Sequence, residues 1–143
     1  MRLQTASETL SFVREFEEKG AAFYEEMAQK FTNDEETFLT FAKENRKFLT
    51  QVQRAYYSVI TDAIEGGYAF NLESDEYDFD TQLADDTSYA DAVAKALNME
   101  EKILDFYEEA AEQSMSLLAD VPRNFKIVAK KRKNRIPKLE SLS

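Results

Sequence analysis

The chain contains one stretch in two versions, FEEKGAAFYEEMAQ at residues 16–29 and MEEKILDFYEEAAE at residues 99–112. At an offset of 83 residues, eight of the fourteen positions are identical, which indicates that the chain consists of two related halves. Each version carries a glutamate seven residues before a tyrosine, which places both side chains on one helix face, two turns apart. The function therefore depends on what these glutamates, Glu17 and Glu100, do.

Composition favours a single helical domain. A chain of 143 residues is long enough for one sizeable core, and three glycines and two prolines are too few for a turn-rich β protein. The chain has no cysteine and no histidine, which excludes disulfides, cysteine-ligated metal centres and the commonest metal ligand. No apolar run approaches the ~18 residues of a membrane span, and the first residues lack the apolar core of a signal peptide. We expect a soluble cytoplasmic protein with no membrane partner.

The net charge of −10 is unevenly distributed along the chain. Residues 123–143 hold eight basic side chains against one acidic one, a net +7, so the other 122 residues carry −17. A basic segment on an acidic body is typical of a nucleic-acid-binding tail. It is equally expected of one basic helix that neutralises its neighbours.

Hydrophobic periodicity predicts four helices and one long connection. Thr5 and Glu8 fit a capping box at the first helix, and Ser88 offers a cap for the third. Pro137 should kink or loosen the last turn of the fourth helix. The connection is long enough to cross a bundle from end to end. The predicted helices cover about residues 6–31, 34–65, 88–117 and 121–142, and the crossover covers residues 66–87.

Each helix has an apolar stripe at a spacing of three and four residues, which predicts an all-α, antiparallel four-helix bundle. The second half of the repeat is weaker, but residues 38–48 align with 125–135 and their inward positions coincide. Polar side chains interrupt the stripes in the middle of the helices. These interruptions are Glu17, Asn45, Glu100, Arg132 and Arg135.

The pattern Glu…Phe-Tyr on the first and third helices, with Phe-x-x-x-Ala before a polar position on the second and fourth, resembles the rubrerythrin-like branch of the ferritin-like superfamily. The resemblance covers all four helices and implies a ferritin-like bundle. In that family the first and third helices each supply one glutamate, and the second and fourth each supply Glu-x-x-His. Together these residues ligate two iron or manganese ions for peroxide reduction or ferroxidase chemistry. Glu17 and Glu100 match the single-glutamate positions.

The other family-equivalent positions depart from this pattern. The second helix has Asn45 and Phe48 where the family has Glu-x-x-His, and the fourth has Arg132 and Arg135. Arginine is permanently protonated and has no lone pair for a metal. Two carboxylates and one amide do not supply enough donors for two cations. We therefore expect no metal, no cofactor and no catalytic residues at this position.

The charges of these residues balance instead. Two glutamates and two arginines predict a buried, bidentate ion-pair network, in which Arg132 and Arg135 stand where the metals would be. Asn45 and the tyrosines that follow the two glutamates, Tyr24 and Tyr107, would satisfy the remaining hydrogen bonds. Phe48 would fill the volume of the missing imidazole.

Three alternatives concern chemistry at or near this centre. A register shift could bring Glu44 inward and leave a weak mononuclear site for iron or manganese. The arginine pair could hold a small anion in a central pocket. The basic run from Lys130 to Lys133 could bind nucleic acid, although the acidic body would repel phosphate, and nucleic acid is not the expected partner.

The predicted crossover combines seven acidic side chains within residues 73–86 with several aromatic ones. The acidic residues favour a solvated, mobile loop. The aromatic residues are too many to be all exposed, so some should cover a bundle end or contact another subunit. They are Tyr68, Phe70, Tyr77 and Phe79.

These expectations favour a non-catalytic scaffold or interaction protein whose dimetal site has been lost. It would be a homodimer formed through outward helix faces such as that of Tyr56, Tyr57 and Ile60. The first alternative is a rubrerythrin-type oxidoreductase with an atypical site, acting on peroxide, oxygen or ferrous iron. The second is a protein that binds anions or nucleic acid through its basic fourth helix.

Overall fold

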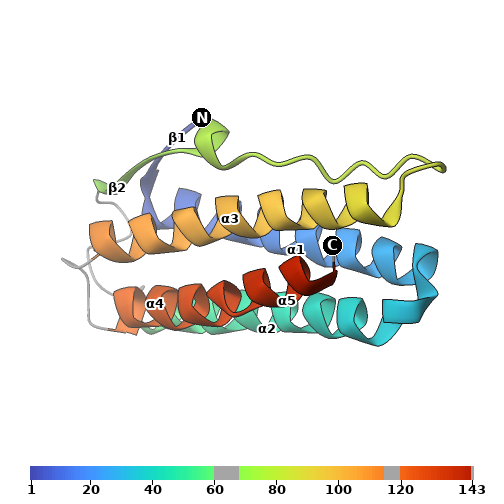
Figure 1. The fold of residues 1–143 in the computed structure, drawn as a ribbon. Coiled ribbons are helices and arrows are strands. Elements are labelled where there is room, and N and C mark those ends of the chain that lie inside the picture. The colour runs from blue at the N-terminus through green and yellow to red at the C-terminus, as the bar shows by residue number, and fades with distance from the viewer. Residues whose placement is uncertain (60–67, 115–119, 143) are drawn as a thin grey trace.

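The computed structural model describes residues 1–59, 68–114 and 120–142, and this part of the chain is mostly helical (Figure 1). The predicted helical class is confirmed, but the structure adds a two-stranded sheet that the sequence did not predict. The elements in chain order are β1 (Arg2–Thr5), α1 (Ala6–Lys30), the 3-10 helix η1 (Thr32–Asp34), α2 (Glu35–Val59), β2 (Tyr68–Glu73), the 3-10 helix η3 (Ser74–Tyr77), α3 (Tyr89–Gln113), α4 (Asp120–Lys133) and α5 (Arg135–Leu142).

The helices begin within one residue of their predicted starts. At α1 the Thr5 hydroxyl accepts from the Glu8 amide at 3.0 Å, and the Glu8 carboxylate accepts from the Thr5 amide at 3.1 Å, which completes the capping box. At α3 the Ser88 hydroxyl accepts from the Asp91 amide at 3.1 Å. The predicted helix ends at residues 65 and 117 lie outside the described residues.

The fourth helix, predicted over residues 121–142 with a kinked or loosened last turn at Pro137, is broken in the structure, but earlier than predicted. The helix is interrupted at Asn134, which separates α4 from α5. Pro137 supplies no amide hydrogen for the carbonyl of Lys133, and its ring crowds that carbonyl. The break therefore falls one turn before the proline, and Pro137 sits in the first turn of α5, where it is tolerated.

The crossover is also more regular than the predicted loop. Its first part is β2, which pairs with β1 in antiparallel register, with Leu3 opposite Leu72. Both leucines are 2% exposed, and Phe70 is also buried, whereas Asn71 is exposed. This alternation lets the sheet cover the helices with one apolar face.

Beyond η3 the crossover runs along the flank formed by α1 and α3 (Figure 1). The Tyr77 ring packs on Phe106 with centroids 5.4 Å apart, and Phe79 is buried under the Lys19 ammonium, 4.6 Å from the ring centroid. The crossover aromatic residues thus cover the helices, as predicted, but along their length as well as near one end. The side chain of Tyr68 lies outside the described residues.

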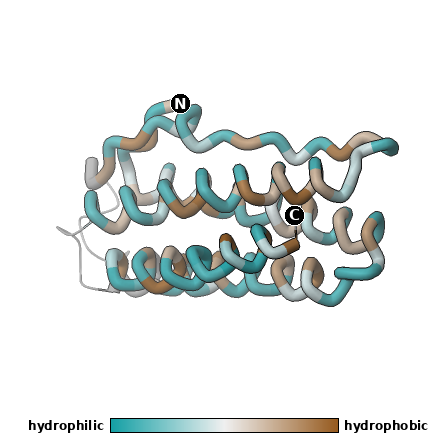
Figure 2. Tube along the Cα trace, viewed as in Figure 1, coloured by the Kyte–Doolittle hydropathy of each residue, from teal (hydrophilic) through white to brown (hydrophobic). Residues whose placement is uncertain are grey.

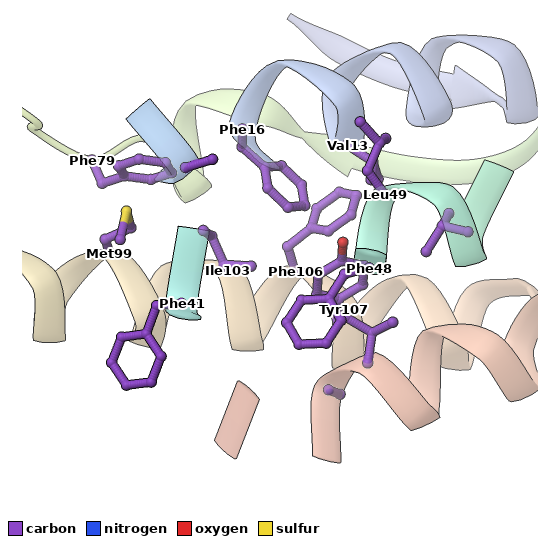
Figure 3. Close-up of a cluster of buried hydrophobic side chains, with 14 of the residues drawn as sticks. Val13, Phe16, Phe41, Phe48, Leu49, Phe79, Met99, Ile103, Phe106 and Tyr107 are labelled. Atoms are coloured by element: carbon purple, nitrogen blue, oxygen red, sulfur yellow. The ribbon is translucent and has the colours of Figure 1, made fainter. Parts of the chain in front are cut away.

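The helices lie side by side and alternate polar and apolar positions along their length (Figures 1 and 2). α1 packs against α2, and α3 packs against α4 and α5. Phe16, Phe106 and Tyr107 point toward one another in the core (Figure 3), with ring centroids 5.1–5.7 Å apart. This packing encloses the polar residues in the middle of each helix.

Candidate functional site

Five elements place one polar side chain each at the centre of the molecule. All five side chains are buried, and four of them are 0% exposed, so none is solvated by bulk water. They are Glu17 on α1, Asn45 on α2, Glu100 on α3, Arg132 on α4 and Arg135 at the first position of α5.

Arg132 bridges the two carboxylates. Its Nη1 donates to Glu100 Oε1 at 2.6 Å, and its Nη2 donates to Glu17 Oε1. One planar guanidinium thereby joins the glutamates of both sequence repeats.

Arg135 contacts a different set of acceptors. Its Nη1 donates to Asn45 Oδ1 at 2.6 Å and to Glu100 Oε2 at 3.1 Å. Its Nη2 donates to the carbonyl of Phe41 at 3.0 Å and to Glu44 Oε1 at 3.2 Å. The Phe41 carbonyl was not among the predicted partners, because a backbone acceptor leaves no signal in the sequence pattern.

The two tyrosines are exchanged between the repeats. Tyr24, from the first repeat, donates its hydroxyl hydrogen to Glu100 Oε2. Tyr107, from the second repeat, donates to Glu17 Oε2 at 2.5 Å. Each glutamate is therefore satisfied by the tyrosine of the other half and not by the one that follows it in sequence.

Aromatic rings surround both guanidiniums. The Phe48 ring centroid lies 5.3 Å from the Arg132 guanidinium carbon and 5.1 Å from that of Arg135. The Phe41 ring lies 4.7 Å from the same atom of Arg135. These faces attract the cations where water is excluded. Phe48 thus packs against the network, at the position where the resemblance implied a histidine.

Gly20 leaves the space that the Asn45 side chain occupies. The Asn45 amide donates to the carbonyl of Glu17 at 3.4 Å, which holds α2 close to α1. A Cβ atom at Gly20 would lie 2.8 Å from Asn45 Nδ2 and 3.4 Å from the sulfur of Met99. A larger residue at position 20 would therefore displace the amide that Arg135 uses as an acceptor.

Electrostatics distinguishes the two glutamates. Burial raises the pKa of Glu17 above its usual value, and the charge of Arg132 only partly opposes this. Burial acts on Glu100 in the same direction, but Arg132 and Arg135 together outweigh it, and the pKa of Glu100 is lowered. Burial raises the pKa of both tyrosines well above the usual value, and the adjacent carboxylates add to that shift. Glu100 is therefore the better-compensated anion.

Arg132 stays positively charged in this buried environment. Burial lowers its pKa, but the charges of Glu100 and Glu17 outweigh burial, so the pKa is raised above its usual value. The Nε atoms of Arg132 and Arg135 are the only parts of the two guanidiniums with no hydrogen-bond partner among the described residues.

This donor set does not fit the dimetal centre that the family resemblance implies. Both oxygens of Glu17 and both oxygens of Glu100 already accept hydrogen bonds from arginine or tyrosine. A metal ion would have to displace Arg132, whose charge repels it. Within residues 1–59, 68–114 and 120–142, no three or more carboxylates gather in a metal-binding cluster.

Glu44, the predicted substitute ligand, is not brought to the centre. Its side chain is 44% exposed and contacts Arg135 from the outer edge of the network. The register shift that would turn Glu44 inward is absent, because α2 presents Asn45 to the centre instead.

Comparison with family profiles, with curated proteins and with solved structures found no match to the chain. None of the helices in the described ranges is both long enough and apolar enough to cross a membrane.

Proposed function

We propose that the protein is a non-catalytic, ferritin-like four-helix bundle of the rubrerythrin-like type, in which an ion-pair network replaces the dimetal site. The observation that supports this proposal is the position of Arg132, whose guanidinium binds both glutamates that the resemblance equates with metal ligands. The protein then acts as a scaffold or interaction protein.

The network supports such a role by joining elements that are distant in sequence. Arg132 ties α4 to α1 and α3, and Arg135 ties α5 to α2 and α3. The two positive and two negative charges balance, so the network fixes the helix register without a cofactor. We expect a buried network of this kind to add little net stability, because the cost of desolvating the charges offsets their pairing.

The rival function, a diiron-type oxidoreductase with an atypical site, makes a different prediction about metal content. Elemental analysis of protein purified without chelator distinguishes the two. We expect less than about half an equivalent of iron, manganese or zinc, with no difference between the native chain and Glu17→Gln.

The matched control is Glu18→Gln, which neutralises an exposed glutamate next in sequence. Metal that is present in the native chain and in the Glu18 variant, but lost from the Glu17 variant, would show a metal site at Glu17 and refute the loss of the dimetal centre.

We further propose that the scaffold is a homodimer. The outward residues on which this expectation rests, Tyr56, Tyr57 and Ile60, have side chains outside the described part of the structure. Light scattering on the native chain gives its mass directly, and a monomer at micromolar concentration would refute the dimer.

A further inference from the structure

The basic residues of α4 do not act alone, because α2 adds a second basic row beside them. Between residues 43 and 54, α2 carries four basic side chains and one acidic one. α2 and α4 are in contact, so their cations line a shared surface. This juxtaposition could not be read from residues 123–143 alone.

Two adjoining hollows lie on this surface. One has a volume of about 830 Å³ and contains Lys43, Arg54 and Lys131 in its lining. The other has a volume of about 380 Å³ and contains Lys138 and Arg135. Lys47, Gln51 and Lys131 line both hollows, so the two form one continuous depression, here called the α2–α4 groove.

The cations of the α2–α4 groove lack carboxylate partners. Within the described ranges, no acidic side chain forms an ion pair with any of five exposed cations. The one carboxylate in the lining, Glu44, accepts from Arg135, and Arg46 is already paired with Glu25 at 3.0 Å. The five unpaired cations are Lys43, Lys47, Arg54, Lys131 and Lys138.

The opposite side of α4 differs from the α2–α4 groove in that acidic residues lie beside its lysines. There, Lys126, Lys130 and Lys133 line a groove that they share with four acidic residues of α3. Positive charge on that side is opposed by neighbouring carboxylates, so the uncompensated potential lies on the α2 side. The acidic residues of that groove are Asp105, Glu108, Glu109 and Glu112.

The lining favours a phosphate chain over an acidic protein segment. Apart from Ala55 and the buried Phe48, the neutral lining side chains are polar, and they include Thr50, Gln51 and Asn134. A docked peptide helix needs apolar anchors, which this groove does not offer. Lysines act as point charges that suit phosphate, and the stretch from Lys43 to Arg54 extends roughly 16 Å along α2.

We propose that the α2–α4 groove binds an extended phosphate chain, the chemistry shared by a single-stranded nucleic-acid backbone and by inorganic polyphosphate. The negative charge elsewhere on the molecule would repel such a ligand and confine it to this face. Five unpaired cations predict that the logarithm of the affinity falls with the logarithm of salt concentration with a slope of about −3.5.

The test measures fluorescence anisotropy of a labelled single-stranded oligonucleotide, with inorganic polyphosphate as the competing probe. The variant is Lys47→Gln with Lys131→Gln in the full chain, because both lysines line both hollows. We expect affinity to fall on the order of tenfold and the salt slope to weaken by about 1.4.

The matched control is Lys126→Gln with Lys130→Gln, which removes the same charge from the other side of α4. Circular dichroism checks that both variants are folded. Binding of either phosphate polymer that weakens only in the Lys47/Lys131 variant supports the proposal and shows which source of phosphate is preferred. Three outcomes would overturn the proposal. They are no binding at low salt, an equal loss of affinity in both variants, and binding of a poly-glutamate peptide as tight as that of the phosphate polymers.

Discussion

At the scale of single residues, Arg132 and Arg135 have unequal roles. Among the described residues, Arg132 is the only arginine that donates a hydrogen bond to Glu17, whereas Glu100 accepts from both Arg132 and Arg135. Loss of Arg132 would leave Glu17 with the Tyr107 hydroxyl as its one side-chain donor among the described residues. Glu17 is therefore the anion that would be stranded.

This inequality predicts which second substitution rescues the first. Arg132→Met should lower the free energy of unfolding by about 3–5 kcal/mol, because it leaves an unpaired buried charge. Adding Glu17→Gln should recover more of that loss than adding Glu100→Gln, since Glu100 keeps Arg135. Urea denaturation of six proteins (the native chain, the three single variants and the two double variants), analysed as two double-mutant cycles, measures both couplings.

Equal recovery by the two glutamines would contradict the hydrogen-bond pattern. Absence of coupling to either glutamate would refute the network itself.

The lowered pKa of Glu100 predicts a pH dependence of stability with a definite sign. A carboxyl group with a lower pKa in the folded state stabilises the fold above its unfolded pKa, and this contribution is lost as pH falls through the folded pKa. The free energy of unfolding of the native chain should therefore decrease as the pH falls below about 4.5. Over the same pH interval, the Glu100→Gln variant should lose less stability than the native chain. Urea midpoints measured through that interval test this.

Glu17 contributes with the opposite sign, because its pKa is raised. Its contribution is present at low pH and declines as pH rises through the folded pKa. A Glu17→Gln variant that lost acid sensitivity as Glu100→Gln does would contradict the raised pKa of Glu17.

The composition of this site could be predicted from sequence, but its bonding could not. Helical periodicity places Glu17, Asn45, Glu100 and both arginines on inward faces, and the structure buries all five. Which guanidinium nitrogen reaches which oxygen depends on side-chain conformations, and the contact of Arg135 with the Phe41 carbonyl depends on backbone position. Neither is encoded in residue spacing.

At the scale of elements, local signals were sufficient for the helix starts and insufficient for the sheet. The Thr5 and Ser88 caps involve neighbours three residues apart, so the sequence contains the whole interaction. β1 has only four residues, and its partner lies about seventy residues further along the chain. Such a short strand has too few alternations to be recognised without its partner.

The sheet predicts a stability effect at a residue outside the helices. Leu3→Ala should lower the free energy of unfolding by about 2–4 kcal/mol, because Leu3 is fully buried beneath the crossover. Its exposed neighbour provides the control, and Gln4→Ala should change stability by less than about 0.5 kcal/mol. Urea denaturation measures both, and hydrogen exchange at Leu72 should quicken only in the Leu3 variant.

A Leu3 variant as stable as the Gln4 variant would show that β1 does not help to hold the crossover on the helices.

At the scale of the whole molecule, basic residues that are far apart in the sequence lie on the same side of the structure. The basic residues at the end of the chain join those of α2, so the positive side of the molecule contains segments from both repeats. The net charge of −10 conceals this surface because it sums over all sides. A composition-based view of partners therefore overlooks the exposed cations on that side.

Each glutamate accepts a hydrogen bond from the tyrosine of the other repeat. This arrangement has a consequence for how the chain could have arisen by gene duplication. A single ancestral half would hold a buried glutamate and a tyrosine that cannot reach it, so it would need a second copy to supply the hydroxyl group. The present chain keeps that dependence inside one polypeptide.

Fragments 1–66 and 67–143 should therefore be largely unfolded apart and should regain helical circular dichroism when mixed. A fragment that folds alone would show that its half satisfies its own glutamate.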